Sequence, residues 1–380
     1  MSWIALRMLV GDTAKYLGMI FGVAFSVLLI SQQSSIFLGL LQRSAAAVVE
    51  VRDANIWVMD PRVQFIDGAR GLPDTALQRV RGVPGVAWAA PHLRTTTTIA
   101  TAGVELTAAS LIGVDDASLA GMPAVVAAGS REALNAPGAV MLNSTGWTFL
   151  FKDKPFEPGL ELELNDSRAV VVGLVDSSQT LSQQVQIYAR YGTALSFAPG
   201  GRNRLSFVLA KAAEDEDARA VAKRIEEVTG LKALSREDFR DATQRYVIFN
   251  TGIPQSFASV VTLGVIVGIV VVALTFSLFI RDNARQFGAL RAIGVSGWQL
   301  TGMVMLQGAV VGVVGYAIGL GIAAWLVEAS AQNVLAFRGF FVPWQVAALS
   351  AAIVVLIIMW AGLGGLRRVL KLDPAVVFRG

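Results

Sequence analysis

The stretch "RDNARQFGALRAIGVSGWQL", Arg281–Leu300, decides how the chain is organised, because it separates two long apolar runs. The run before it, 256–280, holds 25 residues without a charge, and the run after it, 301–327, holds 27. A helix rises about 1.5 Å per residue, so roughly 20 apolar residues cross a hydrocarbon core of about 30 Å. The stretch itself carries three arginines and one aspartate. We therefore expect it to connect two membrane spans on one side of a bilayer.

Two further segments are long and apolar enough to span a membrane. Residues 17–41 are apolar apart from a polar break at 31–35, and residues 344–366 form a run of 23 without a charge. The whole chain is 54% hydrophobic and 16% charged, whereas soluble domains carry about 25% charged residues. The first span is too long for a signal peptide and has no cleavage site close behind it. We expect it to be retained, with its outer half leaving the bilayer as a helix.

The distribution of Lys and Arg predicts the orientation. Residues 1–16, 281–300 and 367–380 together carry nine Lys or Arg and three acids, whereas residues 41–255 carry 22 and 24. Basic segments stay on the cytoplasmic side. We therefore expect a bacterial inner-membrane protein with both termini in the cytoplasm and the large segment in the periplasm. The sequence pI of about 9.5 then matches anionic membrane lipids at the inner face and requires no nucleic-acid partner.

The segment between the first two spans has the patterns of a mixed α+β domain. Thr-rich alternation over 93–115 predicts a β-hairpin that turns at Gly103. The stretch 160–176 predicts a second hairpin that turns at Asn165–Asp166. The stretch "ANIWVMD", 54–60, predicts a strand. These elements indicate a soluble domain of the α+β class.

Helices are predicted in the same segment from their start and stop signals. One begins at Asp74. Another lies within the stretch 214–230, in which Gly230 follows the end of the helix. Ser235 with Asp238 resembles a capping box that starts a helix toward the second span, and Pro254 is expected to kink that helix near the membrane. We expect continuous helices to connect the domain to the membrane on both sides.

Together these patterns predict a membrane protein with four transmembrane α-helices and a large extracytoplasmic α+β domain inserted between the first and second span. The expected segments are an amphipathic cytoplasmic segment at 1–16, a first transmembrane and stalk helix at 17–47, the periplasmic domain at 48–245, a stalk and second transmembrane helix at 246–280, a cytoplasmic helix at 281–300, a third span at 301–327, a short periplasmic loop at 328–343, a fourth span at 344–366 and a cytoplasmic tail at 367–380.

The residue types exclude several functions. The chain has no Cys and one His, His92, so thiolate metal sites and disulfides are excluded and a His-based site would depend on one residue. We expect His92 to be a packing or surface residue. No GxxxxGK[ST] motif occurs, so the chain has no P-loop. The four spans hold no Asp, Glu, Lys, Arg or His, which argues against a proton relay. We expect no catalytic residue, metal or cofactor in this chain.

Glycines in the third span predict close helix packing. They form two GxxxG pairs, Gly308/Gly312 and Gly315/Gly319. Such pairs let helix backbones approach closely. From the pattern alone, the close contact lies either within the chain or across a dimer.

Phe287, Leu290 and Ile293 of the stretch Arg281–Leu300 fall at helical spacing on one face. Gly294 fits the end of a short helix, and Ser296 with Gln299 fits a capping box that opens the third span. The pattern allows an interfacial helix that only seats the hairpin, or a helix that docks on a partner.

The stretch resembles the motif that follows the second span in FtsX/MacB-type ABC transporter permeases, R-x-x-E-[FY]-G-x-L-[RK]-A-[IM]-G. The residues in register are Arg281, Arg285, Phe287, Gly288, Leu290, Arg291, Ala292, Ile293 and Gly294. Gln286 stands where the family usually has Glu. The tail "LRRVLKLDPAVVFRG" resembles the family ending through Asp373, Pro374 and Arg379. Within the family, the chain length and the stretches "ANIWVMDP", 54–61, and "LPDTALQRVRGVPGVAWAAP", 72–91, resemble the DevC-like branch most.

The resemblance implies that the stretch is a coupling helix seated on a separate ATPase subunit, which binds ATP and Mg. It implies a permease dimer, a homodimer by expectation, whose outer domain meets a membrane-fusion adaptor and an outer-membrane channel for export. Within the stretch, Phe287 and Leu290 are expected to fill an ATPase groove with Arg285 and Arg291 at its rim. Alternatives are an FtsX-like regulator of periplasmic cell-wall hydrolases and a lipoprotein-releasing permease.

Overall fold

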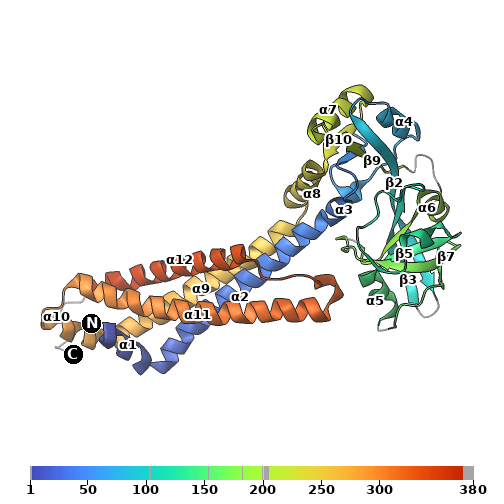
Figure 1. The fold of residues 1–380 in the computed structure, drawn as a ribbon. Coiled ribbons are helices and arrows are strands. Elements are labelled where there is room, and N and C mark those ends of the chain that lie inside the picture. The colour runs from blue at the N-terminus through green and yellow to red at the C-terminus, as the bar shows by residue number, and fades with distance from the viewer. Residues whose placement is uncertain are drawn as a thin grey trace. The chain divides into compact units, whose positions relative to one another are not determined.

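The computed structural model describes residues 2–101, 104–152, 154–181, 183–198, 200 and 205–370. The chain divides into two compact units (Figure 1). The first unit comprises Met1–Gly39 and Gly252–Gly380, and the second comprises Leu40–Thr251. Each unit is described by itself below.

Within the residues that the structure describes, the first unit contains four helices that are long and apolar enough to cross a membrane. They are α2 Thr13–Ser44, α9 Ile253–Asp282, α11 Gly297–Asn333 and α12 Trp344–Leu370. Shorter helices are α1 Ser2–Gly11, α10 Ala284–Ala292 and η3 Leu335–Phe337. The expectation of four apolar spans is confirmed, and α11 is longer at both ends than the predicted 301–327.

One GxxxG pair of α11 packs against α12. A Cβ added to Gly308 would lie 2.7 Å from Cγ2 of Ile358, and one added to Gly312 would collide with the Ile358 Cδ1 atom. Contacts this close are possible only for glycine, because real Cβ atoms do not approach other carbons to this distance.

The second GxxxG pair of α11 packs against α2. A Cβ on Gly315 would lie 2.7 Å from the Val23 Cβ, and one on Gly319 would lie 2.8 Å from the Val27 Cβ and collide with the Ala24 carbonyl oxygen. All four glycines of the two pairs are therefore buried inside one chain. Of the two alternatives that the sequence left open, the structure supports packing within the chain. The alternative of a dimer contact through these glycines is wrong.

Two buried polar side chains of the first unit donate to backbone carbonyls of another helix. The Gln307 side-chain amide donates to the Ala5 carbonyl over 2.8 Å and ties α1 to α11. The Ser26 hydroxyl donates to the Gly264 carbonyl over 2.7 Å and ties α2 to α9. In an apolar surrounding an unpaired polar group is costly, so these bonds fix the order of the helices.

Helix α1 departs from the expected amphipathic segment 1–16. Ala5 and Leu9 are buried, but Trp3 and Val10 on the outer side are also apolar and exposed. Arg7 is the exposed charge of α1, and its guanidinium lies 4.7 Å from the centre of the Trp3 ring. The outer face of α1 is therefore mainly apolar.

The described part of the second unit forms one ten-stranded sheet with the order β10-β1-β9-β2-β3-β8-β5-β7-β4, and β6 pairs with β2 and β7. The strands are β1 Ile56–Met59, β2 Val86–Thr101, β3 Val104–Val114, β4 Val126–Ala128, β5 Ala139–Asn143, β6 Leu160–Leu164, β7 Ser167–Val175, β8 Gln186–Arg190, β9 Phe207–Ala212 and β10 Lys232–Ser235. The helices are α3 Ala46–Glu50, η1 Ile66–Gly68, α4 Thr75–Arg81, η2 Arg131–Asn135, α5 Ser144–Phe151, α6 Tyr191–Phe197, α7 Ala218–Thr229 and α8 Arg236–Asn250. The long strand β2 joins both parts of the sheet, because its first half pairs with β9 and its second half with β3.

Both predicted hairpins are present. Strands β2 and β3 pair antiparallel, and the expected turn residue Gly103 lies outside the described residues. Strands β6 and β7 are joined at Asn165 and Asp166, which both have positive φ, 48° and 61°. Two consecutive residues with positive φ are typical of the turn that matches the twist of a two-residue hairpin.

The connection from the second unit to the second span differs from the expected continuous helix. The Ser235 hydroxyl accepts from the Asp238 N–H and caps α8, as predicted. Helix α8 ends at Asn250, however, and α9 begins at Ile253 with Pro254 in its first turn. Proline lacks an N–H but fits the first turn, where no intrahelical donor is needed, so it starts a new helix and does not kink an old one.

The lone histidine is a core residue of the second unit. His92 is 2% exposed and meets the Trp57 ring edge-on at 5.5 Å, beside Phe207. Burial, with a smaller contribution from the Arg94 charge, lowers the pKa of the His92 imidazole to about 3. His92 therefore stays neutral in the folded protein, which agrees with a packing role.

His92 is expected to make the second unit sensitive to acid. Below pH about 6.5 the imidazole of the unfolded chain takes up a proton, whereas that of the folded chain does so only near pH 3. The unfolded state therefore binds more protons in this window, and acid favours unfolding by up to about 1.4 kcal/mol per pH unit. Thermal unfolding of wild type and His92→Phe at pH 7.5, 6 and 5 measures the effect. The variant should lose less stability than wild type on acidification, and parallel pH profiles would contradict this origin.

Candidate functional site

The candidate site is the connection between the second and third spans, and Asn283 sets its geometry. The Asn283 side-chain amide donates to the Phe279 carbonyl over 2.9 Å and ends α9. The Asn283 carbonyl then accepts from the N–H groups of Gln286 and Phe287 at 3.0 and 3.1 Å, which starts α10. The helix is therefore interrupted at Asn283, and α10 begins there as a separate helix.

One face of α10 packs into the chain's own core. Phe287 is 1% exposed within a cluster that includes Phe279 and Leu300, and Gly288 is also buried. Leu290 is partly buried against the same cluster. The expectation that Phe287 is presented to a partner is therefore wrong, because its ring is enclosed by the helices of the first unit.

The turn after α10 returns the chain to the bundle and opens the next helix. Gly294 has a φ of +95°, a conformation that favours glycine. Val295 then enters the core. The Ser296 hydroxyl accepts from the Gln299 N–H, and the Gln299 side chain accepts from the Ser296 N–H, so the predicted capping box at the start of α11 is confirmed.

The outer surface of the connection combines charges with two large apolar side chains. Ile293 is 79% exposed and Trp298 is 85% exposed. Other exposed side chains of this connection belong to Arg281, Asp282, Arg285, Gln286, Ala289, Ala292, Ser296 and Gln299. Sequence reasoning included Ile293 as a motif residue but missed Trp298. The signal for Trp298 was available, because a tryptophan two residues after a capping serine lies on the first turn of the next helix.

A groove of about 610 Å³ lies beside this surface, between the α1–α2 turn and the α9–α10 junction. Asp12 lines one side, and Asp282 and Gln286 line the other. Lys15 lies 2.6 Å from a carboxylate oxygen of Asp282 and also pairs with Asp12. Hydrogen bonding to Lys15 holds the pKa of the Asp12 carboxyl below its usual range. The groove joins segments more than 250 residues apart in the sequence, so periodicity could not predict it.

The remaining predicted residues are placed as follows. Asp373, Pro374 and Arg379 of the C-terminal motif lie outside the described residues. Among the residues that the structure describes, no group of three His, Asp or Glu is placed to hold a metal ion. The exposed surface of the α9–α11 connection combines apolar side chains with charged ones, which suits binding of another protein.

Comparison with known protein families agrees with both units. Residues 16–228 match the family described as MacB-like periplasmic core domain, and residues 258–374 match FtsX-like permease C-terminal. These matches and the four apolar helices define a membrane-embedded permease with a periplasmic domain. The chain belongs to the FtsX/MacB-like ABC transporter permease family. Members of this family work with an ABC ATPase as partner.

Three solved structures are similar to about half of the chain. The extracellular domain of YknZ, a noncanonic ABC-type transporter from Gram-positive bacteria, is 13% identical with a TM-score of 0.35, covering 48% of this chain and 98% of its own. The periplasmic region of MacB from Actinobacillus actinomycetemcomitans is 13% identical with a TM-score of 0.37, covering 51% and 94%. A domain of a putative permease from Porphyromonas gingivalis is 16% identical with a TM-score of 0.31, covering 48% and 88%. No curated protein matches the chain. Because these scores are low, the family assignment rests on the two sequence matches.

Proposed function

We propose that the chain is the permease subunit of a mechanotransmission ABC transporter, in which ATP hydrolysis by a separate ATPase changes the conformation of the periplasmic domain. The observation that carries the proposal is the connection between α9 and α11. It exposes Ile293 and Trp298 beside arginines, while its other face is packed into the core. Large exposed apolar side chains with a charged rim are typical of a protein contact site.

The direct contact of this connection with the helices supports a coupling role. Phe287 packs into the same cluster as Phe279 of α9 and Leu300 of α11. A load applied to Ile293 or Trp298 is therefore transmitted to both helices through close-packed side chains, which deform little. ATP and Mg would be bound by the ATPase, and this chain would need no cofactor of its own.

The assembly we propose is a homodimer of permeases with two ATPases, a membrane-fusion adaptor and an outer-membrane channel, working in export. Because the four α11 glycines are used inside the chain, the dimer contact lies on other surfaces. Purification of the tagged full-length protein from its native membrane tests the proposal. An ABC ATPase with an adaptor supports export, and an ATPase with a cell-wall hydrolase supports the regulatory alternative. A preparation free of any ATPase contradicts the proposed function.

The proposed orientation has its own test. Ser130 lies on the exposed surface of the second unit and Ala292 on that of the α9–α11 connection. Since the protein has no native cysteine, single Ser130→Cys and Ala292→Cys variants report one position each. In intact spheroplasts an impermeant thiol reagent should label the first and spare the second, and both should react after lysis. Labelling of Ala292→Cys from outside would reverse the orientation and remove the coupling role.

A further inference from the structure

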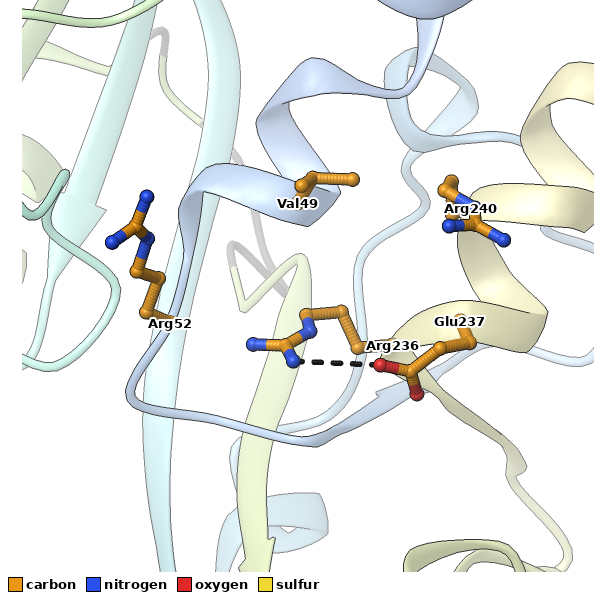
Figure 2. Close-up of a pocket in the computed structure, with 5 residues that line it drawn as sticks. All are labelled: Val49, Arg52, Arg236, Glu237 and Arg240. Atoms are coloured by element: carbon orange, nitrogen blue, oxygen red, sulfur yellow. Dashed lines mark hydrogen bonds and ion pairs between the residues drawn. The ribbon is translucent and has the colours of Figure 1, made fainter.

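A cleft in the second unit is lined by an unusual set of side chains. One side of the cleft is formed by α3 and the residues that follow it, and the other side by the first turns of α8. The cleft has a volume of about 350 Å³. Its lining residues are Val49, Arg52, Arg236, Glu237 and Arg240. Figure 2 shows Arg52 on one side and Arg236 and Arg240 on the α8 side, with the Arg236 guanidinium extended toward Arg52. Three guanidinium groups thus share one cleft with one carboxylate.

These three arginines differ by their contacts from three others in the same unit that join separate elements. Arg94 of β2 lies 3.0 Å from Asp67, Arg219 of α7 lies 3.0 Å from Asp238, and Arg224 of α7 donates to the Pro84 carbonyl over 2.7 Å. Such contacts account for the presence of those arginines, because each holds two segments of the fold together.

The arginines of the cleft make no comparable link among the described residues. Arg236 lies 3.4 Å from Glu237 and Arg240 lies 2.7 Å from Asp241, in both cases the next residue in the chain. Arg52 has no hydrogen-bond or ion-pair partner among those residues. The carboxylate of nearby Glu50 is engaged by the Ser178 N–H at 2.9 Å. The side chains of these three arginines therefore do not hold separate segments of the described fold together.

We propose that the cleft binds a phosphate group of a small organic phosphate or a phospholipid. A guanidinium presents a planar fork of donors that matches phosphate oxygens and binds them with charge-assisted hydrogen bonds. A phosphate monoester offers three terminal oxygens and the phosphodiester of a phospholipid offers two, so in either case Arg52 and Arg236 can bind from opposite sides, while Arg240 adds positive charge to the same cleft. Val49, 47% exposed at the same cleft, provides apolar contact for the carbon part of the ligand. This site is separate from the proposed ATPase contact and does not depend on it.

Equilibrium dialysis of radiolabelled glycerol 3-phosphate against the full-length protein in detergent, at constant ionic strength, tests the site. Wild type should bind one equivalent saturably. Arg52→Ala and Arg236→Ala should each weaken binding at least about tenfold, because each removes a charge-assisted donor. Arg52→Lys should retain part of the affinity, since it keeps the charge and loses the fork. Arg168→Ala is the matched control, because it removes an exposed arginine from β7 with the same change in net charge.

The outcomes separate the site from non-specific attraction and the two sources of phosphate from each other. Equal binding by wild type, Arg168→Ala and the cleft variants would place the ligand elsewhere and overturn the proposal, as would the absence of saturable binding by a wild type that unfolds cooperatively. In nanodiscs, phosphatidylglycerol should displace glycerol 3-phosphate if the cleft takes a lipid headgroup, and leave its binding unchanged if the cleft takes a soluble phosphate. Cooperative thermal unfolding of each variant near the wild-type temperature shows that lost binding is not lost folding.

Discussion

Replacing Gly319 with alanine is expected to destabilise the membrane unit severely. The new Cβ would lie 2.8 Å from the Val27 Cβ and 3.0 Å from the Ala24 Cα, and it would collide with the Ala24 carbonyl oxygen. These are backbone and near-backbone atoms, so no rotamer change relieves the contact and α2 must move away from α11. Overpacking of this kind costs about 1–3 kcal/mol. In a bilayer close packing itself holds helices together, so a lower melting temperature and loss of folded protein in detergent should follow.

Gly321 is the matched control on the same helix. A Cβ added there meets nothing within 4 Å, and alanine is the better helix former by about 1 kcal/mol. Gly321→Ala should therefore unfold at or slightly above the wild-type temperature. If Gly319→Ala and Gly321→Ala behave alike in thermal unfolding, the close contact of α2 with α11 is not what stabilises the bundle.

Ile293→Glu is expected to abolish binding of the ATPase while leaving the permease folded. Ile293 is 79% exposed, so a carboxylate at this position is solvated in the isolated permease. In the proposed complex the same carboxylate would be buried unpaired in an apolar contact, which costs several kcal/mol. Since about 1.4 kcal/mol is a tenfold change in affinity, binding should fall by a factor of 100 or more. Co-purification of the ATPase and its turnover in the reconstituted complex measure the effect.

Phe287→Ala and Val228→Glu complete the comparison. Phe287 is buried in the bundle, so its truncation should cost about 3–5 kcal/mol of stability and lower the yield of folded permease. Val228→Glu introduces the same charge at an exposed apolar position of α7 in the second unit and should retain the ATPase. Normal ATPase binding and turnover with Ile293→Glu would leave the α9–α11 connection as a simple connector.

Leu290 illustrates why the structure changes the choice of test. From the motif alone Leu290 is the natural anchor to replace, but it packs partly against the core of the first unit. A charge at Leu290 would damage the fold and the interface together, and the two effects could not be separated. Ile293 and Trp298 lie outside that core, so substitutions there report on the partner.

The local elements were predictable because their causes are local. The apolar runs define the four membrane helices, since only a helix satisfies its own backbone in lipid. Ser296 with Gln299 defines the start of α11, and the Asn165–Asp166 pair defines a hairpin turn. The FtsX/MacB-like motif was readable for the same reason, because its residues are contiguous.

The direction of each side chain was decided only by the tertiary structure. Helical spacing placed Phe287 and Ile293 on one face, but α10 ends at Ala292 and Ile293 lies past its end. Phe287 is consequently buried and Ile293 exposed. The partners of Gly308 and Gly319, the groove at Asp282 and the cleft at Arg52 depend on contacts between segments far apart in the chain. The sequence by itself determined the spans, their order and the turns, whereas long-range packing determined which residues remain available for a partner or a ligand.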